Sequence, residues 1–476
     1  MTTSFANDET ASNPAIAKAT ESVQAAVPVA AADPDRPVWH FRPAAQWMND
    51  PNGTIYFEGW YHVFYQFNPY GDGWGHMHWG HTRSRDLVHW ELLPVALWPS
   101  EEKGEEHCYS GTVAINSDGR PTALYTSVGF KNVRSEFEQW AALGDDDLTV
   151  WEKHPANPIL TLETHGGPKL GPEWRDPFIF SEAGRTFLLL GADTESHTDV
   201  LLYEAADGTL TKWEYKKVLF RQSKPFTIFL ECPNFFKLGD KWVLAVSPYR
   251  AVEYYVGTFD INTLEFKQER HGRIDESPDF YATNIAIDEK GRRVLFGWVR
   301  GFKQKKGWNG CLALPRIPSL GPDGYLRMSP APEIRSLRGD HTGAAGISLE
   351  SGGHVIDGAL GDTLEVLAEF TPGDAVAYGL KVRRSDDGSQ GIPIRIEKNS
   401  VNVGGKKYAF EHESGKPLTL NVFIDKSLVE VFIDGGRVCV TRVIYSRPSD
   451  LGVEVFAEGG STRVDSIDVW TLKPVW

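Results

Sequence analysis

Three short stretches of the chain each place a carboxylate beside a turn-forming proline. They are Asn-Asp-Pro-Asn-Gly at Asp50, Arg-Asp-Pro at Asp176 and Glu-Cys-Pro at Glu231. Each alone could be a plain turn, because Asn, Asp, Pro and Gly are the usual turn residues. Carboxylates brought together, however, can cleave a glycosidic bond: one attacks the sugar or activates water, and another protonates the departing oxygen. Such chemistry requires a fold that gathers the three acids.

Metal binding is the competing use of clustered carboxylates. Calcium takes six to eight oxygens, often from one loop of the type D-x-D-x-D-G, and the sequence has no such loop. The acidic run at 145–147 is expected to be solvated. The cysteines are widely separated and form no CxxC pair, which suggests neither a zinc site nor a disulfide framework: Cys108, Cys232, Cys311 and Cys439. We therefore expect no metal and no cofactor.

Composition narrows the class of partner. The net charge of −15 argues against nucleic acid or an anionic membrane surface, and no apolar run approaches the ~18 residues of a spanning helix. Sixteen Trp residues fit a sugar-binding cleft, although large all-β cores also use aromatics. Residues 1–36 are rich in Ala, Ser, Thr and Pro and are expected to be disordered. They make a poor signal-peptide core, so we expect a cytoplasmic protein, or a secreted one if an export signal has been removed.

The chain repeats itself after residue 37. A short apolar run follows a Gly or Asp turn five times: at 59–67, 119–127, 184–192, 240–248 and 291–299. A second element follows most of these runs, as in "DLVHWE", "DLTVWE", "TLTKWE" and "TLEFKQ". A third element precedes each run. The period of about 55 to 60 residues with four strands per unit is typical of a β-propeller.

Five such units fit between residues 37 and 335, and the first strand of each is expected to line a central channel. The start of the first strand offers Asp50, Ser110, Asp176 and Glu231 in units one to four, and Asp279 lies just ahead of the fifth. Symmetry brings equivalent positions together around the axis. The repeat therefore predicts that Asp50, Asp176 and Glu231 converge at one mouth of the channel.

Longer alternating strands dominate after residue 338, as in "DTLEVLAEF" and "SLVEVFIDGG". They predict a separate antiparallel β-sandwich over 338–476, joined through 319–334. The predicted fold is thus all-β: a five-bladed β-propeller followed by a C-terminal antiparallel β-sandwich.

Several motifs resemble glycoside hydrolase family 32, the group of invertases, inulinases and levanases. They are "HFRPAAQWMNDPNG", "FYQFNP", "WGHMHWGHTRSRDLVHW", "YSGT", "WRDPF" and "ECPNFF". The resemblance runs from Trp39 onward and implies the same propeller-plus-sandwich fold. It also implies that Asp50 is the nucleophile, Glu231 the general acid/base and Asp176 the transition-state stabiliser of a retaining enzyme. Retention requires the nucleophile and the acid/base to lie roughly 5 Å apart.

Further motif positions match the fructose pocket of that family. They are Trp47, Asn49, Gln66, Trp74, Tyr109, Ser110, Arg175 and Trp298, with Asp279 and Tyr281 behind them. Trp74 and Trp298 could instead be wall packing, and Arg175 a structural partner of an acid. Tyr109 stands where the family usually has Phe, which adds a hydroxyl. Cys232 should point away from Glu231 if the strand alternates, so we expect it to pack in the core.

The resemblance implies a β-fructofuranosidase that removes terminal fructose from sucrose and short fructo-oligosaccharides. An exo-inulinase or levanase, or a fructosyltransferase, is the nearest alternative, because a second sugar can replace water at the covalent intermediate. Arabinan- and xylan-cleaving hydrolases and a non-catalytic sugar-binding protein are weaker alternatives. The sandwich is a candidate for homo-oligomer contacts. The sequence does not distinguish β-2,1 from β-2,6 linkage.

Overall fold

The computed structural model describes residues 13–131, 133, 136–412 and 415–476. The chain divides into two compact units. The first comprises residues 1–32, 41–273 and 280–326, and the second comprises residues 33–40, 274–279 and 327–476. The division falls inside one strand, β22 (Leu326–Pro330), some ten residues before the predicted start of the sandwich at 338.

Five sheets make up the first unit in the described residues. The first holds β1 (Gln46–Phe57), β2 (Trp60–Asn68), β3 (His78–Ser84) and β4 (Trp90–Leu97), with β19 (Trp308–Asn309) beside β1. The second holds β5 (Glu105–Ile115), β6 (Pro121–Gly129), β7 (Phe137–Gly144) and β8 (Trp151–Lys153), and the 3-10 helix η1 (Glu101–Lys103) precedes it. The third holds β9 (Trp174–Glu182), β10 (Arg185–Asp193), β11 (His197–Ala205) and β12 (Trp213–Ser223).

The fourth sheet holds β13 (Glu231–Leu238), β14 (Lys241–Ser247), β15 (Glu253–Asp260) and β16 (Glu265–Arg273). The fifth holds β17 (Phe280–Ile287), β18 (Arg293–Val299), β20 (Cys311–Leu312), β21 (Arg316–Leu320) and β22. The five apolar runs of the sequence repeat are the second strands of these sheets: β2, β6, β10, β14 and β18. The repeat therefore identified the correct strands.

The second repeated element begins the outermost strand in four sheets, and its leucine has a fixed backbone role. Leu87, Leu148, Leu210 and Leu264 all have left-handed φ angles between 56° and 63° and are buried. In two of the sheets, the Trp three residues later donates its indole N–H to the leucine carbonyl, at 2.8 Å from Trp151 and 3.0 Å from Trp213. A leucine in this conformation is costly, so the buried side chain and the Trp must hold the turn.

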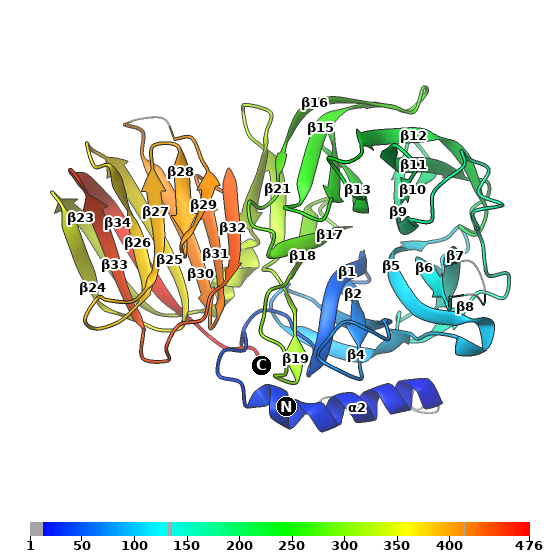
Figure 1. Cartoon of the computed structure of the whole chain (residues 1–476), viewed down its shortest axis with the longest axis horizontal. Coiled ribbons are helices and arrows are strands. Elements are labelled where there is room, and N and C mark those ends of the chain that lie inside the picture. The colour runs from blue at the N-terminus through cyan, green and yellow to red at the C-terminus, as the bar shows by residue number, and fades with distance from the viewer. Residues whose placement is uncertain (1–12, 132, 134–135, 413–414) are drawn as a thin grey trace. The chain divides into compact units, whose positions relative to one another are not determined.

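The first strands of the five sheets form a closed ring of contacts. β1 contacts β5 and β17, β9 contacts β5 and β13, and β13 contacts β17. Figure 1 shows these five strands nearest the middle of the first unit, with β4, β8, β12 and β16 at its outside. The start of each first strand therefore faces the same central space.

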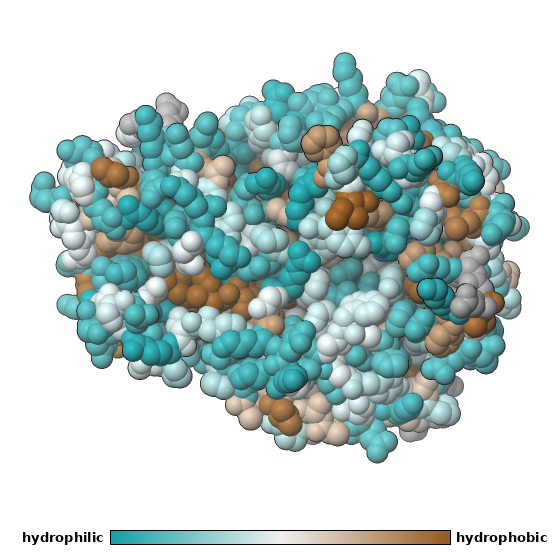
Figure 2. Space-filling model, in the orientation of Figure 1, coloured by the Kyte–Doolittle hydropathy of each residue, from teal (hydrophilic) through white to brown (hydrophobic). Residues whose placement is uncertain are grey.

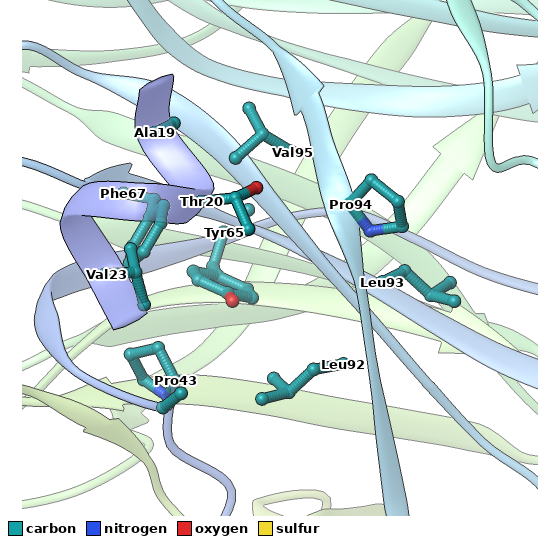
Figure 3. A pocket seen from close by; sticks show the side chains of 12 residues that line it. Ala19, Thr20, Val23, Pro43, Tyr65, Phe67, Leu92, Leu93, Pro94 and Val95 are labelled. Atoms are coloured by element: carbon teal, nitrogen blue, oxygen red, sulfur yellow. The ribbon is translucent and has the colours of Figure 1, made fainter. Parts of the chain in front are cut away.

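The expected disorder of residues 1–36 is wrong for the described part of that segment; residues 1–12 lie outside the described residues. Helix α2 (Pro14–Ala31) begins at Asn13, whose side chain accepts from the Ala15 N–H at 3.0 Å. Its buried residues recur at helical spacing: Ile16, Ala19, Val23 and Ala30. This face packs on β1 and β4. Figure 3 shows Ala19, Thr20 and Val23 of the helix beside a small pocket whose far wall includes Leu92, Leu93 and Val95.

The second unit contains two six-stranded antiparallel sheets that share one apolar core. One has the order β23 (Arg338–Leu349), β34 (Thr462–Leu472), β25 (Thr363–Pro372), β30 (Leu418–Asp425), β31 (Leu428–Ile433) and β32 (Val438–Val443). The other has the order β24 (Gly352–Leu360), β33 (Gly452–Glu458), β26 (Ala377–Arg384), β27 (Ile392–Glu397), β28 (Ser400–Val403) and β29 (Lys406–Ala409). The 3-10 helix η2 (Pro332–Leu337) precedes β23. In β27, Ile392, Ile394 and Ile396 alternate into the core, as a sheet with one covered face requires.

Two short segments from earlier in the chain belong to the second unit, and hydrogen bonds to an aspartate hold each of them there. Asp425 accepts from the backbone N–H groups of Val38, Trp39 and His40 at 2.8–3.0 Å. Asp275 accepts from the Thr441 N–H at 3.0 Å and from its hydroxyl at 2.7 Å. The alternation of apolar and polar residues that marks strands in the sequence gives no sign of these long-range hydrogen bonds.

Hydrophilic residues cover most of the face shown in Figure 2, with smaller apolar patches between them. None of the helices described here is long and apolar enough to cross a membrane.

Candidate active site

Every first strand of the first unit carries a β-bulge near its start. In each, two residues of the first strand stand opposite one residue of the second strand. The bulged pairs are Asn49-Asp50, Tyr109-Ser110, Asp176-Pro177, Cys232-Pro233 and Ala282-Thr283. A bulge breaks the alternation of side chains and re-aims them. The repeated bulge thus turns consecutive residues toward the central space.

The three predicted carboxylates converge on one pocket, which Asp50, Asp176 and Glu231 line together. They do not occupy the same bulge position, contrary to the equivalence that the repeat suggested. Asp50 is the second bulged residue of its strand, Asp176 is the first of its strand, and Glu231 precedes the bulge of β13. The five-fold repeat brings the strands together. Because the three acids hold different positions relative to the bulges, they lie at different depths in the pocket.

Asp50 is held as a hydrogen-bond acceptor. Its Oδ1 accepts from Asn49 Nδ2 at 3.0 Å, and its Oδ2 accepts from the Ser110 hydroxyl at 3.0 Å. Burial, with nearby Glu231 adding to it, raises the pKa of Asp50 above its usual value, while the donors from Asn49, Ser110 and Cys232 oppose that rise. The donors therefore favour the ionised carboxylate that an attacking group needs.

Asp176 lies deeper, at a left-handed backbone position with φ of 65°. Its Oδ2 accepts from the Cys232 N–H at 2.9 Å. Burial raises the pKa of Asp176, and Glu231 and Asp50 add to the rise, whereas Arg175 opposes it. Three crowded acids in one pocket thus disfavour full ionisation together, which is the expected cost of a catalytic carboxylate cluster.

Glu231 is bound at both oxygens. Arg175 Nη2 lies 3.0 Å from Oε1, and the Tyr281 hydroxyl lies 2.6 Å from Oε2. Both neighbours come from other sheets, β9 and β17. The side chain of Glu231 remains 18% exposed, so it can still reach a ligand in the pocket.

Arg175 is fixed from several directions. Its guanidinium stacks on the Phe229 ring at 4.1 Å, forms an ion pair with Glu173 and donates to the Tyr249 hydroxyl at 2.9 Å. Burial would lower its pKa, but Asp176 and Glu231 outweigh burial and raise it. Arg175 is therefore a permanent cation between the acids.

The other predicted pocket residues divide into two groups. Asn49, Gln66, Trp74, Tyr109, Arg175, Tyr281 and Trp298 line the pocket. Ser110 and Trp47 lie behind its surface: Ser110 binds Asp50 and accepts from Gln66 Nε2 at 2.6 Å, and the Trp47 ring packs edge-on to Trp298 with centroids 5.7 Å apart. Trp47 also donates its indole N–H to Asn49 Oδ1 at 2.8 Å, so it orients the residue that binds Asp50.

The rim of the pocket carries an exposed aromatic. Trp74 is 53% exposed and lies edge-on to Tyr109, with ring centroids 6.1 Å apart. An exposed indole beside a polar pocket is suited to stacking on an apolar sugar face. Burial raises the pKa of Tyr109 to about 12, so its hydroxyl is a neutral donor or acceptor at neutral pH.

Three expectations for neighbouring residues differ from the structure. Cys232 does not pack away from the acids: its Sγ lies 3.7 Å from Asp50 Oδ2 and 3.8 Å from Asp176 Oδ2, because the bulge and its left-handed φ of 47° reverse the alternation. Tyr281, expected behind the pocket residues, lines the pocket and contacts Glu231 directly. Asp279, also expected behind them, does not line the pocket; it belongs to the second unit, where it accepts from Arg442 Nε and from the Val443 N–H, both at 3.3 Å.

Sequence reasoning missed five residues that line the pocket: Glu136, Phe137, Glu173, Tyr249 and Arg300. Tyr249 and Arg300 follow the second strands β14 and β18 by one or two residues. Because a second strand runs antiparallel to the first, its end lies beside the start of the first strand. The residue directly after the fourth and fifth apolar runs was therefore a usable signal.

This arrangement can perform acid/base and nucleophilic chemistry at a sugar. It offers a carboxylate that accepts two hydrogen bonds, an acid bound at both oxygens and a third acid that is more deeply buried. Aromatic side chains and, among the described residues, two arginines complete its walls. In the described part of the chain, no group of three or more His, Cys, Asp or Glu side chains has the geometry to hold a metal ion. The donor set fits sugar hydroxyls and an oxocarbenium-like transition state.

Comparison with known proteins agrees with this chemistry. The chain is 30% identical to a levanase of Bacillus subtilis over 93% of its own length and 71% of the relative. It is 29% identical to a sucrose-6-phosphate hydrolase of Escherichia coli, over 92% of this chain and 94% of that one. A sucrose complex of a Bombyx mori family 32 beta-fructofuranosidase variant superposes with a TM-score of 0.82 at 27% identity, covering 98% of this chain and 99% of that one.

Two family models together match nearly all of the chain from residue 40 onward. The model of the glycosyl hydrolases family 32 N-terminal domain matches residues 40–330, and that of the family 32 C-terminal domain matches residues 333–471. Both matches begin after helix α2, so this helix lies outside the matched residues. With the clustered acids in place, these matches establish that the chain is a glycoside hydrolase and belongs to glycosyl hydrolases family 32.

Proposed function

We propose that this chain is a retaining β-fructofuranosidase that releases terminal β-D-fructosyl units from sucrose and short fructo-oligosaccharides. The observation that carries the proposal is the convergence of Asp50, Asp176 and Glu231 on one pocket. Asp50 accepts from Asn49 and Ser110, whereas Glu231 is 18% exposed and is bound by Arg175 and by the Tyr281 hydroxyl. Two carboxylates beside one sugar can supply the nucleophile and the general acid that cleavage of a glycosidic bond needs.

In the first half of the reaction, an Asp50 oxygen attacks the anomeric carbon of the fructosyl unit. The glycosidic bond breaks, and the departing oxygen takes the proton of Glu231. In the second half, Glu231 as a carboxylate removes a proton from water, whose oxygen attacks the same carbon and releases Asp50. Asp176 binds sugar hydroxyls while the ring flattens, with its orientation fixed by the Cys232 N–H. The geometry change and the charge development are those of glycoside hydrolysis with retention.

The charges around the pocket favour a neutral sugar over a sugar phosphate. Among the lining residues that the structure describes, acidic side chains outnumber the two cations, which are Arg175 and Arg300. Arg175 is already bound to Glu231 and Glu173. A phosphate would lie among carboxylates and would cost electrostatic energy. Sucrose is therefore a better fit than its 6-phosphate, although a relative named above acts on the phosphate.

We further propose that the five sheets of the first unit are the blades of a five-bladed β-propeller and that the second unit is a β-sandwich. The ring of first-strand contacts supports the first statement, and the core shared by two sheets supports the second. In this architecture the pocket lies at one mouth of the channel, where loops from all five blades can shape it.

A product profile on sucrose, sucrose 6-phosphate, inulin and levan tests the function. We expect fructose from sucrose and from the chain ends of short fructans, and a lower kcat/KM on the phosphate. Asp50→Asn and Glu231→Gln should fold as the unmodified enzyme does and lose at least about 10³-fold in kcat on sucrose. Near-normal hydrolysis by both variants would exclude this mechanism.

Transfer of the fructosyl unit to a second sugar is the remaining candidate. The exposed Trp74 at the rim offers a stacking surface for such an acceptor. Longer oligosaccharides at high sucrose concentration would favour a transferase, and free fructose would favour hydrolysis.

A further inference from the structure

Tyr281 is a neutral group in direct contact with Glu231, and its hydroxyl has three neighbours at hydrogen-bond distance among the described residues. The Tyr249 backbone N–H donates to it at 2.9 Å, the Ser247 carbonyl oxygen lies at 2.8 Å, and Glu231 Oε2 lies at 2.6 Å. A phenol hydroxyl has one proton, and a carbonyl can only accept. When the Tyr281 proton points to Ser247, the short contact with Oε2 is a hydrogen bond only if Oε2 carries a proton.

The contact of the other Glu231 oxygen, Oε1, also places the carboxyl proton on Oε2. Oε1 lies 3.0 Å from Arg175 Nη2, and a guanidinium can only donate. Oε1 must therefore be an acceptor, and a neutral Glu231 has its proton on Oε2, facing the Tyr281 oxygen.

The charged groups around this pair come from three sheets other than that of Glu231. Asp50 and Asp176 line the same pocket as Glu231, and Arg175 forms an ion pair with it. The Arg300 guanidinium covers the face of the Tyr281 ring at 4.4 Å from its centroid. The Tyr249 hydroxyl accepts from Arg175 at 2.9 Å and is also a hydrogen-bond neighbour of Glu231. The ring of Tyr281 is buried and clamped, so only its hydroxyl proton is free to change direction.

We infer that Tyr281 is a positioning residue that holds the proton of Glu231 on Oε2 and then donates its own hydroxyl proton to that oxygen once the acid has protonated the leaving group. This inference rests on the proposed role of Glu231 as general acid. The Oε2 proton moves to the glycosidic oxygen as the carbon–oxygen bond breaks and Asp50 bonds to the sugar. The Tyr281 O–H then turns from the Ser247 carbonyl to the new carboxylate. When Glu231 takes a proton from water, the hydroxyl turns back.

The experiment compares two substrates whose leaving groups differ in their need for a proton: sucrose and p-nitrophenyl β-D-fructofuranoside. The readout is kcat/KM, which reports the fructosylation step for both. The variants are Tyr281→Phe, Glu231→Gln and the control Tyr203→Phe. Tyr203 is also a buried tyrosine of the first unit, and its hydroxyl binds His165 at 3.0 Å, away from the pocket. Thermal unfolding is measured for all three to verify folding.

Tyr281→Phe should lose about 10- to 100-fold in kcat/KM on sucrose and less than about threefold on the nitrophenyl substrate, because nitrophenolate departs without a proton. Glu231→Gln should show the same selectivity with a larger loss, and Tyr203→Phe should show neither. Equal losses on both substrates in Tyr281→Phe, or no loss on sucrose, would overturn the inference while Glu231→Gln stays selective. If Glu231→Gln itself loses both activities equally, the proposed acid is wrong, and the inference fails with it.

Discussion

Cys232 Sγ lies 3.7 Å from Asp50 Oδ2, although Cys232 directly follows Glu231 along the chain. Glu231 lines the pocket, and the next residue of β13, Cys232, lies buried against Asp50 and Asp176. The cause is the bulge of that strand together with the left-handed backbone of Cys232. The thiol stands between Asp50 and Asp176 as a weak donor, and burial with three nearby acids raises the pKa of Cys232 far enough to keep it protonated.

Replacing this thiol should change the acid side of the pH profile. In Cys232→Ala, Asp50 loses a donor, and its pKa, already raised by burial, should rise further. Because Asp50 must be ionised to attack, the acidic limb of kcat/KM should move to higher pH by up to about half a pH unit, since a weak hydrogen bond is at stake. The control is Cys108→Ala, another buried thiol, beside Glu105 rather than Asp50. An unchanged limb, or one at lower pH, would contradict the role of the thiol.

The sequence repeat located the three acids of the pocket but not their different positions relative to the bulges. Turn residues and apolar runs mark where strands begin, so Asp50, Asp176 and Glu231 could be assigned to the starts of three first strands. A bulge inserts one extra residue into a strand, and the amino-acid pattern of the strand does not reveal where the insertion lies. The register of Cys232 could therefore not be predicted, and neither could the direct contact of Tyr281 with Glu231.

Helix α2 was missed for a different reason. Its buried face contains two alanines beside Ile16 and Val23, so the periodic signal is weak, and Pro28 lies inside the helix. Contacts with distant strands stabilise it, which composition does not report. A composition rich in Ala, Ser, Thr and Pro thus shows only that the local sequence pattern is weak. It does not show that the segment lacks a helix in the folded protein.

Val23→Asp should release helix α2 from β1 and β4. A buried valine replaced by an unpaired charge should cost at least about 2 kcal/mol of the docking free energy. Hydrogen exchange of the backbone amides in 14–31 should then accelerate strongly, whereas Ala25→Asp, at an exposed position of the same helix, should leave it slow. Fast exchange in the unmodified protein would mean that the helix does not dock.

The acid cluster should reduce stability at neutral pH. Burial raises the pKa of Asp176 above its value in the unfolded chain, so the folded state binds more protons between those two pKa values, and stability falls as pH rises through that window. Asp176→Asn removes this loss and can still accept the Cys232 N–H. We expect a higher melting temperature at pH 7, by about 2 to 4 °C per kcal/mol gained, with the gain vanishing near pH 4. Activity on sucrose should fall sharply. A lower melting temperature at pH 7 would show that ionised Asp176 stabilises the fold.

In the second unit, by contrast, the charged form of a buried group, His40, should stabilise the fold. Its Nδ1 lies 2.9 Å from Asp425 and its Nε2 lies 2.9 Å from Glu430. Burial would lower the pKa of His40, but the two carboxylates outweigh burial and raise it. The charged imidazole therefore contributes stability that is fully present below the unfolded pKa of about 6.5 and is lost as pH rises through the folded pKa.

His40→Gln should destabilise the protein by about 3 to 5 kcal/mol near pH 6, because it leaves two buried carboxylates without their cation. The difference from the unmodified protein should shrink as the pH rises through the raised pKa of His40, because the imidazole of the unmodified protein then loses its proton. Urea unfolding at several pH values measures it. His341→Gln is the matched control, because His341 pairs with Asp468 at 2.8 Å but is 48% exposed, and an exposed pair contributes at most about 1 kcal/mol. A His40→Gln loss that stays constant from pH 5 to 9 would mean that packing, and not the charge of His40, stabilises this part of the second unit.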